Sequence, residues 1–171
     1  MNRHLFAFGS GPPFTDNLAV KYIKLTKSGP ISIILVEREG WQSYMPNYTN
    51  RLKTYHSGRF SYIPLPTIQE VRAVKQIKAS GGIVICGGDT ARYADYIADT
   101  TIGTAIKEVY EQGVPVAGFS AGALISPQIC SISASDTIQK FSVDRQGIGL
   151  LENICFAVHF SEWNEESHLR E

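Results

Sequence analysis

A serine, a histidine and an aspartate occur in this chain in settings that suit acyl transfer. Ser120 lies in the segment Val114–Ala123, where a short apolar strand runs into a serine flanked by small residues and then into a helix-compatible stretch. Such a strand-to-helix turn pushes a serine hydroxyl clear of the backbone, and only small neighbours fit beside it. The pattern is typical of a nucleophile elbow. A serine that only caps the following helix gives the same pattern, so both interpretations stand at this point.

A serine nucleophile needs a base that takes its proton and a third group that orients the base. His159 lies near the end of a strand predicted over Cys155–Phe160, so it should emerge at the same sheet edge as Ser120. We therefore predict His159 as the base, with a structural edge histidine as the alternative. Asp136, just beyond the helix after Ser120, is the predicted acid, and Asp144 in a polar loop is its rival. As the alternative to catalysis, either one is a plain turn aspartate.

Acyl transfer also needs N–H donors for the oxyanion that forms on the substrate carbonyl. The N–H of Ala121 directly follows the serine and is the natural first donor. The turn Gly87-Gly88-Asp89 follows another strand, and its glycines let the backbone approach a ligand closely. We expect Gly87 and Gly88 to supply the second donor, while Asp89 also caps the next helix.

Short apolar strands alternate with helical patterns along the chain. The strands are predicted at Leu5–Phe8, Ile31–Val36, Phe60–Pro64, Gly82–Cys86 and Val114–Phe119. Helices are predicted over 14–26, after Pro46, over 67–79 with a capping box of Thr67 and Glu70, and over 90–112 with a break near 99–100. Continuous apolar strands that alternate with helices predict an α/β fold with a doubly wound, mostly parallel sheet and helices on both faces. Ligands bind at the carboxyl ends of such strands, where the Gly-rich exits fall.

Composition narrows the function classes. The chain has 171 residues, enough for a single domain over 1–171, and its 16 basic and 16 acidic residues give no net charge. Nothing therefore attracts nucleic acid or an anionic membrane, and no apolar run approaches the length of a membrane span. Three cysteines without CxxC spacing indicate a reducing compartment, which we take to be the cytoplasm. Scattered histidines predict no metal site, and Phe14 in place of the third glycine of G-x-G-x-x-G argues against a dinucleotide cofactor.

The glycine turn, the serine segment and the histidine resemble a known family when taken together. The segments Gly87–Thr90, Gly118–Ala123 and Val158–Phe160, with Asp136 between the last two, are similar in order and spacing to peptidase family S51. This is the dipeptidase E and cyanophycinase family of serine peptidases, in the class I glutamine-amidotransferase-like superfamily. The resemblance covers most of the chain from about Ile31 onward.

The resemblance implies a flavodoxin-like, class I glutamine-amidotransferase-like sandwich that hydrolyses short peptides without a cofactor. It implies Ser120 as the nucleophile, His159 as the base and Asp136 as the third member. The oxyanion hole would then be formed by the Gly87–Gly88 turn and the N–H of Ala121.

Two departures from the family pattern matter for the substrate. The family usually continues for several tens of residues past the histidine, so we expect the chain, which ends at Glu171, to lack a natural C-terminal segment. The aspartyl dipeptidases of the family carry a basic segment after the histidine, whereas this chain has Glu162 and further acidic residues there. Like charges repel, which argues against a strict preference for an N-terminal aspartate. Asp89, Thr90 and Glu162 are instead candidates for contact with a substrate, its α-amine in particular.

Two other functions remain as alternatives. An α/β-hydrolase esterase shares the serine motif and the Ser, Asp, His order. Asp136 follows Ser120 by only 16 positions, which leaves no room for the βα unit that this fold requires. A catalytically inactive binding module on the same fold is the second alternative. An exposed sheet edge would favour self-association, so a homodimer is also open.

Overall fold

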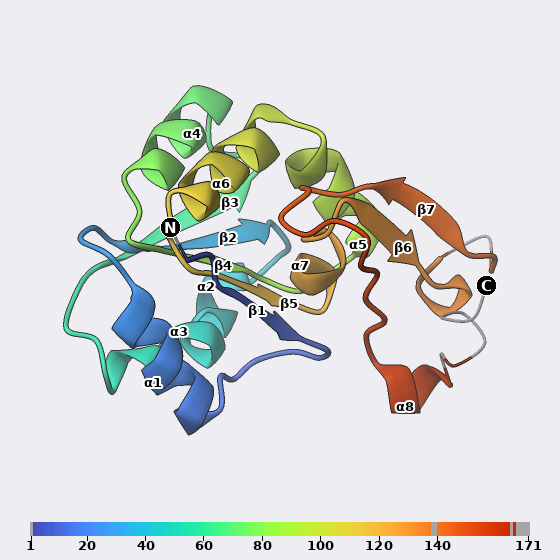
Figure 1. Ribbon diagram of the computed structural model, residues 1–171, viewed down its shortest axis with the longest axis horizontal. Helices are drawn as coiled ribbons and strands as arrows, with labels where there is room; N and C mark the ends of the chain where they lie inside the picture. Colours follow the sequence, from blue (N-terminus) through green and yellow to red (C-terminus); the bar gives the residue numbers. More distant parts are fainter. Residues whose placement is uncertain (1, 138–139, 165, 167–171) are drawn as a thin grey trace.

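A parallel sheet of five strands forms the centre of the computed structural model, which describes residues 2–137, 140–164 and 166 (Figure 1). The strands are β1 (Leu5–Phe8), β2 (Ile31–Val36), β3 (Phe60–Leu65), β4 (Gly82–Ile85) and β5 (Val116–Phe119). All five predicted strands are confirmed, two of them with the predicted bounds and the other three with one end displaced by one or two residues. Their order in the sheet is β1-β5-β4-β2-β3.

The sheet order brings three strand exits together. Strand β5 lies between β1 and β4, with Phe8 opposite Phe119 and Ile85 opposite Gly118. Every residue of β2, β4 and β5 is buried because these strands lie inside the sheet, whereas β1 and β3 form its edges. The carboxyl ends of β1, β5 and β4 are therefore neighbours, and the chain leaves these three strands at the same end of the sheet.

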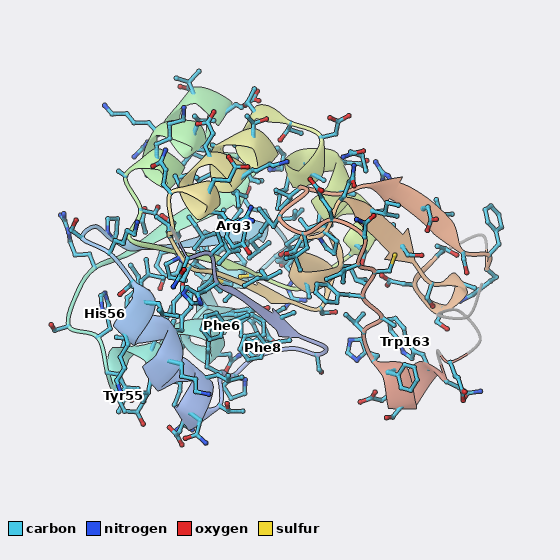
Figure 2. All side chains as sticks on the ribbon, in the orientation of Figure 1. Arg3, Phe6, Phe8, Tyr55, His56 and Trp163 are labelled. Carbon is cyan, nitrogen blue, oxygen red and sulfur yellow. The ribbon has the colours of Figure 1, made fainter. Side chains whose placement is uncertain are left out.

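Helices cover both faces of the sheet, as expected for a doubly wound fold. Helices α4 (Glu70–Lys78) and α6 (Thr101–Glu111) pack on one face, and α1 (Asp16–Leu25), α2 (Trp41–Tyr44) and α3 (Pro46–Lys53) lie on the other (Figure 1). Phe6 and Phe8 extend from β1 toward the second layer, and the ring of Phe6 meets that of Tyr22 on α1 at 5.5 Å (Figure 2). Aromatic side chains thus fill the space between the sheet edge and α1.

The predicted break in the long helical region is confirmed. The chain passes through α5 (Thr90–Tyr93) and a π-helical turn, η1 (Ala94–Ala98), before α6 begins. Thr100 caps α6, since its hydroxyl accepts a hydrogen bond of 3.1 Å from the N–H of Ile102. The capping box of Thr67 and Glu70 is wrong.

Helix α4 begins three residues after Thr67, and its N-cap, Gln69, makes no side-chain cap. The Thr67 hydroxyl donates to the carboxylate of Glu37, and the carboxylate of Glu70 accepts from the hydroxyl of Thr101. Both side chains thus form hydrogen bonds with residues distant in the sequence, and neither caps the N-terminus of α4.

The C-terminal part differs from the sequence prediction. An antiparallel hairpin of β6 (Ile129–Ile132) and β7 (Val143–Gln146) carries a 3₁₀ turn, η2 (Ala134–Asp136), and follows the short helix α7 (Ala121–Leu124). The predicted strand over Cys155–Phe160 is wrong. Residues 154–157 are irregular, and α8 (Phe160–Trp163) begins where the strand was expected to end.

None of the helices in the described part of the chain is long and apolar enough to cross a membrane.

Candidate functional site

Ser120 occupies a strained turn between β5 and α7. Its backbone has φ 49° and ψ −109°, a region that side-chain-bearing residues rarely adopt. The turn is also crowded. A Cβ at Gly118 would lie 2.4 Å from the carbonyl oxygen of Gly122, and a Cβ at Gly122 would lie 2.5 Å from that of Ile85. Only glycine fits at these two positions, which explains the small residues around the serine.

The structure brings Ser120 and His159 together. The Oγ of Ser120 lies 3.3 Å from the Nε2 of His159, within hydrogen-bond reach. No strand carries the histidine there. Instead, the backbone N–H of His159 donates a hydrogen bond of 2.9 Å to the carbonyl of Gly9, which follows the neighbouring strand β1.

An aromatic side chain supports the imidazole from α8. Trp163 packs its ring against that of His159 at a centroid distance of 4.7 Å, and the backbone N–H of Trp163 donates a hydrogen bond of 2.9 Å to the His159 carbonyl (Figure 2). His159 itself adopts a left-handed conformation, φ 50° and ψ 35°, at the start of this helix. Two backbone hydrogen bonds and one ring contact therefore fix the histidine in a segment without regular strand structure.

Asp136 and Asp144 lie in different surroundings. Asp136, in η2, accepts a hydrogen bond from the hydroxyl of Thr90, the first residue of α5. Asp144 lies in β7 opposite Ser131, and it is exposed. Within the residues that the structure describes, no hydrogen bond joins either carboxylate to His159. Asp136 is nevertheless held at the helix that follows the glycine turn.

The glycine turn lies directly against Ser120. A Cβ at Gly87 would meet the Cβ of Ser120 at 3.3 Å and the carbonyl oxygen of Phe119 at 3.2 Å. The N–H of Gly87 is already engaged, because it donates a hydrogen bond of 2.9 Å to the hydroxyl of Tyr48. This leaves Gly88 and Ala121 as the candidate oxyanion donors. Ala121 begins α7, and the first N–H groups of a helix have no acceptor within it.

Two tyrosines at this turn were missed by the sequence reasoning. Tyr48 comes from α3, and Tyr93 ends α5, where its hydroxyl donates to the carbonyl of Gly87 at 3.1 Å. Burial raises the pKa of both phenols and of the neighbouring thiol of Cys86. The two phenols and the thiol are therefore uncharged, and the two phenols pack against the glycine turn through their hydrogen bonds with Gly87. No motif marks Tyr48 in the sequence, since it is one of several aromatic residues between 41 and 56.

The three predicted substrate contacts are placed differently from one another. Asp89 caps α5, because its carboxylate accepts a hydrogen bond of 3.0 Å from the N–H of Arg92, so its predicted capping role is confirmed. Thr90 is only 2% exposed and supports Asp136. Glu162 is exposed on α8, three residues after His159. Of the three, Asp89 and Glu162 are accessible to a ligand.

Among the described residues, no three His, Cys, Asp or Glu side chains gather in a way that could hold a metal ion.

Comparisons with known proteins identify a family and two solved structures with a similar fold. The pattern of peptidase family S51 matches residues 37–170. A crystal structure of a peptidase from an acI-B1 Actinobacterium superposes with a TM-score of 0.70 at 22% identity and covers 97% of this chain and 73% of its own. A proposed peptidase E from Listeria monocytogenes EGD-e superposes with a TM-score of 0.70 at 17% identity, over 98% of this chain and 87% of its own. A search of curated proteins found no match.

Proposed function

The chain belongs to peptidase family S51 and is a serine-type peptidase, and from this premise we propose that it hydrolyses short peptides through an acyl-enzyme on Ser120. The observation that supports the proposal best is the 3.3 Å distance between Ser120 Oγ and His159 Nε2. The strained turn adds to it, since the strain presents the hydroxyl at the sheet edge where three strand exits meet.

The proposed reaction has two halves. His159 takes the proton of Ser120 as the Oγ attacks the carbonyl carbon of the substrate, and the N–H groups of Gly88 and Ala121 bind the oxyanion. The C–N bond then breaks, and His159 gives the proton to the leaving amine. In the second half, His159 activates a water molecule that hydrolyses the serine ester and restores the free hydroxyl.

We propose Asp136 as the third member of the triad. Its hydrogen bond with Thr90 supports this choice, because it holds the carboxylate beside the turn that touches Ser120. The rival Asp144 is exposed on the hairpin. A carboxylate near the histidine would orient the imidazole and stabilise the imidazolium that forms during proton transfer.

The substrate is proposed to be a short peptide with a free N-terminus. The exposed carboxylates of Asp89 and Glu162 lie on the segments that follow the glycine turn and the histidine, and both suit a positively charged α-amine. The same charges disfavour an acidic N-terminal residue.

A dipeptide panel tests this function. It contains Asp-X, Arg-X and Ala-X members with free and acetylated N-termini, and it is given to the wild-type chain and to Ser120→Ala. We expect turnover of free Ala-X or Arg-X members that is lost in Ser120→Ala. Cleavage of nitrophenyl esters without any cleavage of dipeptides would indicate an esterase. A folded protein that turns over neither substrate class would indicate a binding module.

A further inference from the structure

The peptide unit between Gly87 and Gly88 carries one of the two proposed oxyanion donors, and glycines leave such a unit free to rotate. Neither residue has a Cβ that would restrict its backbone dihedral angles. In a trans peptide, the C=O and the N–H point in opposite directions. The direction of the Gly88 N–H is therefore set by whatever holds the carbonyl of Gly87.

That carbonyl is held by Tyr93. The Tyr93 hydroxyl donates to it at 3.1 Å from a side chain that is only 2% exposed. The Tyr93 ring also underlies the next residue, because a Cβ at Gly88 would come within 2.8 Å of its Cε2. Rotation of the peptide unit would break a buried hydrogen bond and leave the carbonyl without this partner.

Tyr48 binds the other backbone polar group of Gly87, its N–H. Its hydroxyl accepts the hydrogen bond of the Gly87 N–H at 2.9 Å, and its ring packs edge-on against Phe119, which precedes Ser120, at 5.2 Å. Both backbone polar groups of Gly87 are thus bonded to buried phenols from two different helices. The N–H of Gly88 is directed away from Tyr93 by the geometry of the peptide unit.

We propose that Tyr93, assisted by Tyr48, is a positioning residue that locks the Gly87–Gly88 peptide unit with the Gly88 N–H toward the oxyanion. The inference rests on the proposed acyl-enzyme function and adds the residues that orient its oxyanion hole. Neither tyrosine touches the substrate. Each acts through the backbone of the glycine turn, so its effect should appear when the oxyanion forms and not when the substrate binds.

The test compares three variants that each remove one buried phenol hydroxyl. Tyr93→Phe and Tyr48→Phe keep the rings and lose the hydrogen bonds to Gly87. The matched control is Tyr22→Phe, which loses a buried hydrogen bond of 2.9 Å to the carbonyl of Ile83, at the opposite end of β4. Melting temperatures identify any variant that is not folded.

For the best dipeptide of the panel, we expect kcat to fall about tenfold or more in Tyr93→Phe with KM little changed. Loss of a whole oxyanion donor costs about 10²–10³ in kcat, and a donor whose orientation is only loosened costs less. Tyr48→Phe should show a smaller fall of the same kind, and Tyr22→Phe should keep the wild-type kcat.

A second readout reports on the oxyanion directly. The amino aldehyde that corresponds to the N-terminal residue of the best dipeptide adds to the serine Oγ, forming an O–C bond and an oxyanion on the former aldehyde oxygen, while the serine proton passes to His159. Its affinity should fall in Tyr93→Phe by about the same factor as kcat/KM.

The possible outcomes are distinct. An unchanged kcat and aldehyde affinity in a folded Tyr93→Phe would overturn the inference and leave the proposed function intact. If Tyr93→Phe does not fold, the same two measurements on Tyr48→Phe decide in the same way. An equal fall in Tyr22→Phe would mean a general loss of stability and would also overturn the inference. A wild-type chain without dipeptide turnover or aldehyde binding would overturn the proposed function and the inference together.

Discussion

The strain at Ser120 predicts that glycine at this position stabilises the protein relative to alanine. Both Ser120→Ala and Ser120→Gly remove the hydroxyl, but only alanine keeps a Cβ in a backbone with φ 49° and ψ −109°. A side-chain-bearing residue in such a region costs about 1–3 kcal/mol, and glycine does not incur this cost. Glycine instead gives the unfolded chain more freedom, which costs about 0.5–1 kcal/mol. The difference leaves Ser120→Gly more stable by roughly 1 kcal/mol.

The assay is urea unfolding of the two variants side by side, followed by fluorescence. Urea unfolding gives the difference in the free energy of unfolding directly. In thermal unfolding of a chain of this length, the same difference of about 1 kcal/mol corresponds to a melting temperature higher by roughly 2–4 °C. Ala123→Gly is the matched control, because Ala123 is buried in α7 and is not among the residues with positive φ. The same alanine-to-glycine exchange should there lower the unfolding free energy by about 1 kcal/mol or more.

The two exchanges should therefore have opposite signs at positions three residues apart. If Ser120→Gly is no more stable than Ser120→Ala, the turn stores no strain that acts through the Cβ. The explanation of the small residues around the serine would then rest on crowding alone. Both Ser120 variants should be inactive on the dipeptide panel, so the stability gain would come with complete loss of turnover.

Three further predictions follow from the described contacts. Gly122→Ala should lower the free energy of unfolding in urea by about 1–3 kcal/mol and abolish dipeptide turnover, because its new Cβ would meet the backbone of Ile85 at 2.5 Å. Wild-type stability of this variant would contradict the crowding of the turn. Arg145→Met should change the unfolding free energy by less than about 1 kcal/mol, since its ion pair with Asp95 of η1 is half-exposed and its other bond is to the backbone carbonyl of Ala91 in α5. It should still lower kcat by loosening the hairpin that carries Asp136, and an unchanged kcat would separate the hairpin from the site. Only Cys155 should react with a thiol reagent at pH 8 in the native protein, because burial raises the pKa of the thiols of Cys86 and Cys130 and keeps them neutral. All three thiols should react in denaturant. Rapid reaction of more than one thiol in the native protein would contradict the burial of Cys86 and Cys130.

The parallel sheet could be predicted because its strands are continuous apolar runs that alternate with helical patterns. Such runs fit only strands that are buried on both faces, and β2, β4 and β5 are buried at every position. The hairpin was missed for the opposite reason. Strands β6 and β7 have only four residues each, and in β7 a single apolar residue, Val143, is followed by three polar ones with no residue buried. The pattern there is too weak to predict strands.

The histidine segment shows how an apolar run can mislead. Cys155–Phe160 looks like a strand, but Cys155 is exposed and Phe160 is 46% exposed, so the run does not enter the sheet. His159 still reaches Ser120, because a backbone hydrogen bond to Gly9 holds the segment at the end of β1. The prediction of proximity therefore stands on a different contact from the one expected.

The glycine turn marks the limit of motif reasoning at the site. Its two glycines indicate close approach of the backbone, and Gly87 does lie against Ser120. Which N–H groups face the site depends on side chains that pack from elsewhere in the chain. Tyr48 lies 39 residues before Gly87, and its hydrogen bond with the Gly87 N–H follows from the packing of α3 under the sheet edge. No spacing within the motif carries that information.

The contact between Trp163 and His159 gives this protein an optical reporter of its own. An indole ring whose centroid lies 4.7 Å from that of an imidazole senses whether the imidazole carries a proton, since an imidazolium quenches indole emission. The chain holds two tryptophans, and replacing Trp41 with phenylalanine would leave the emission of Trp163 alone. The charge on His159 could then be followed through the fluorescence of Trp163 in the milliseconds after mixing with a peptide.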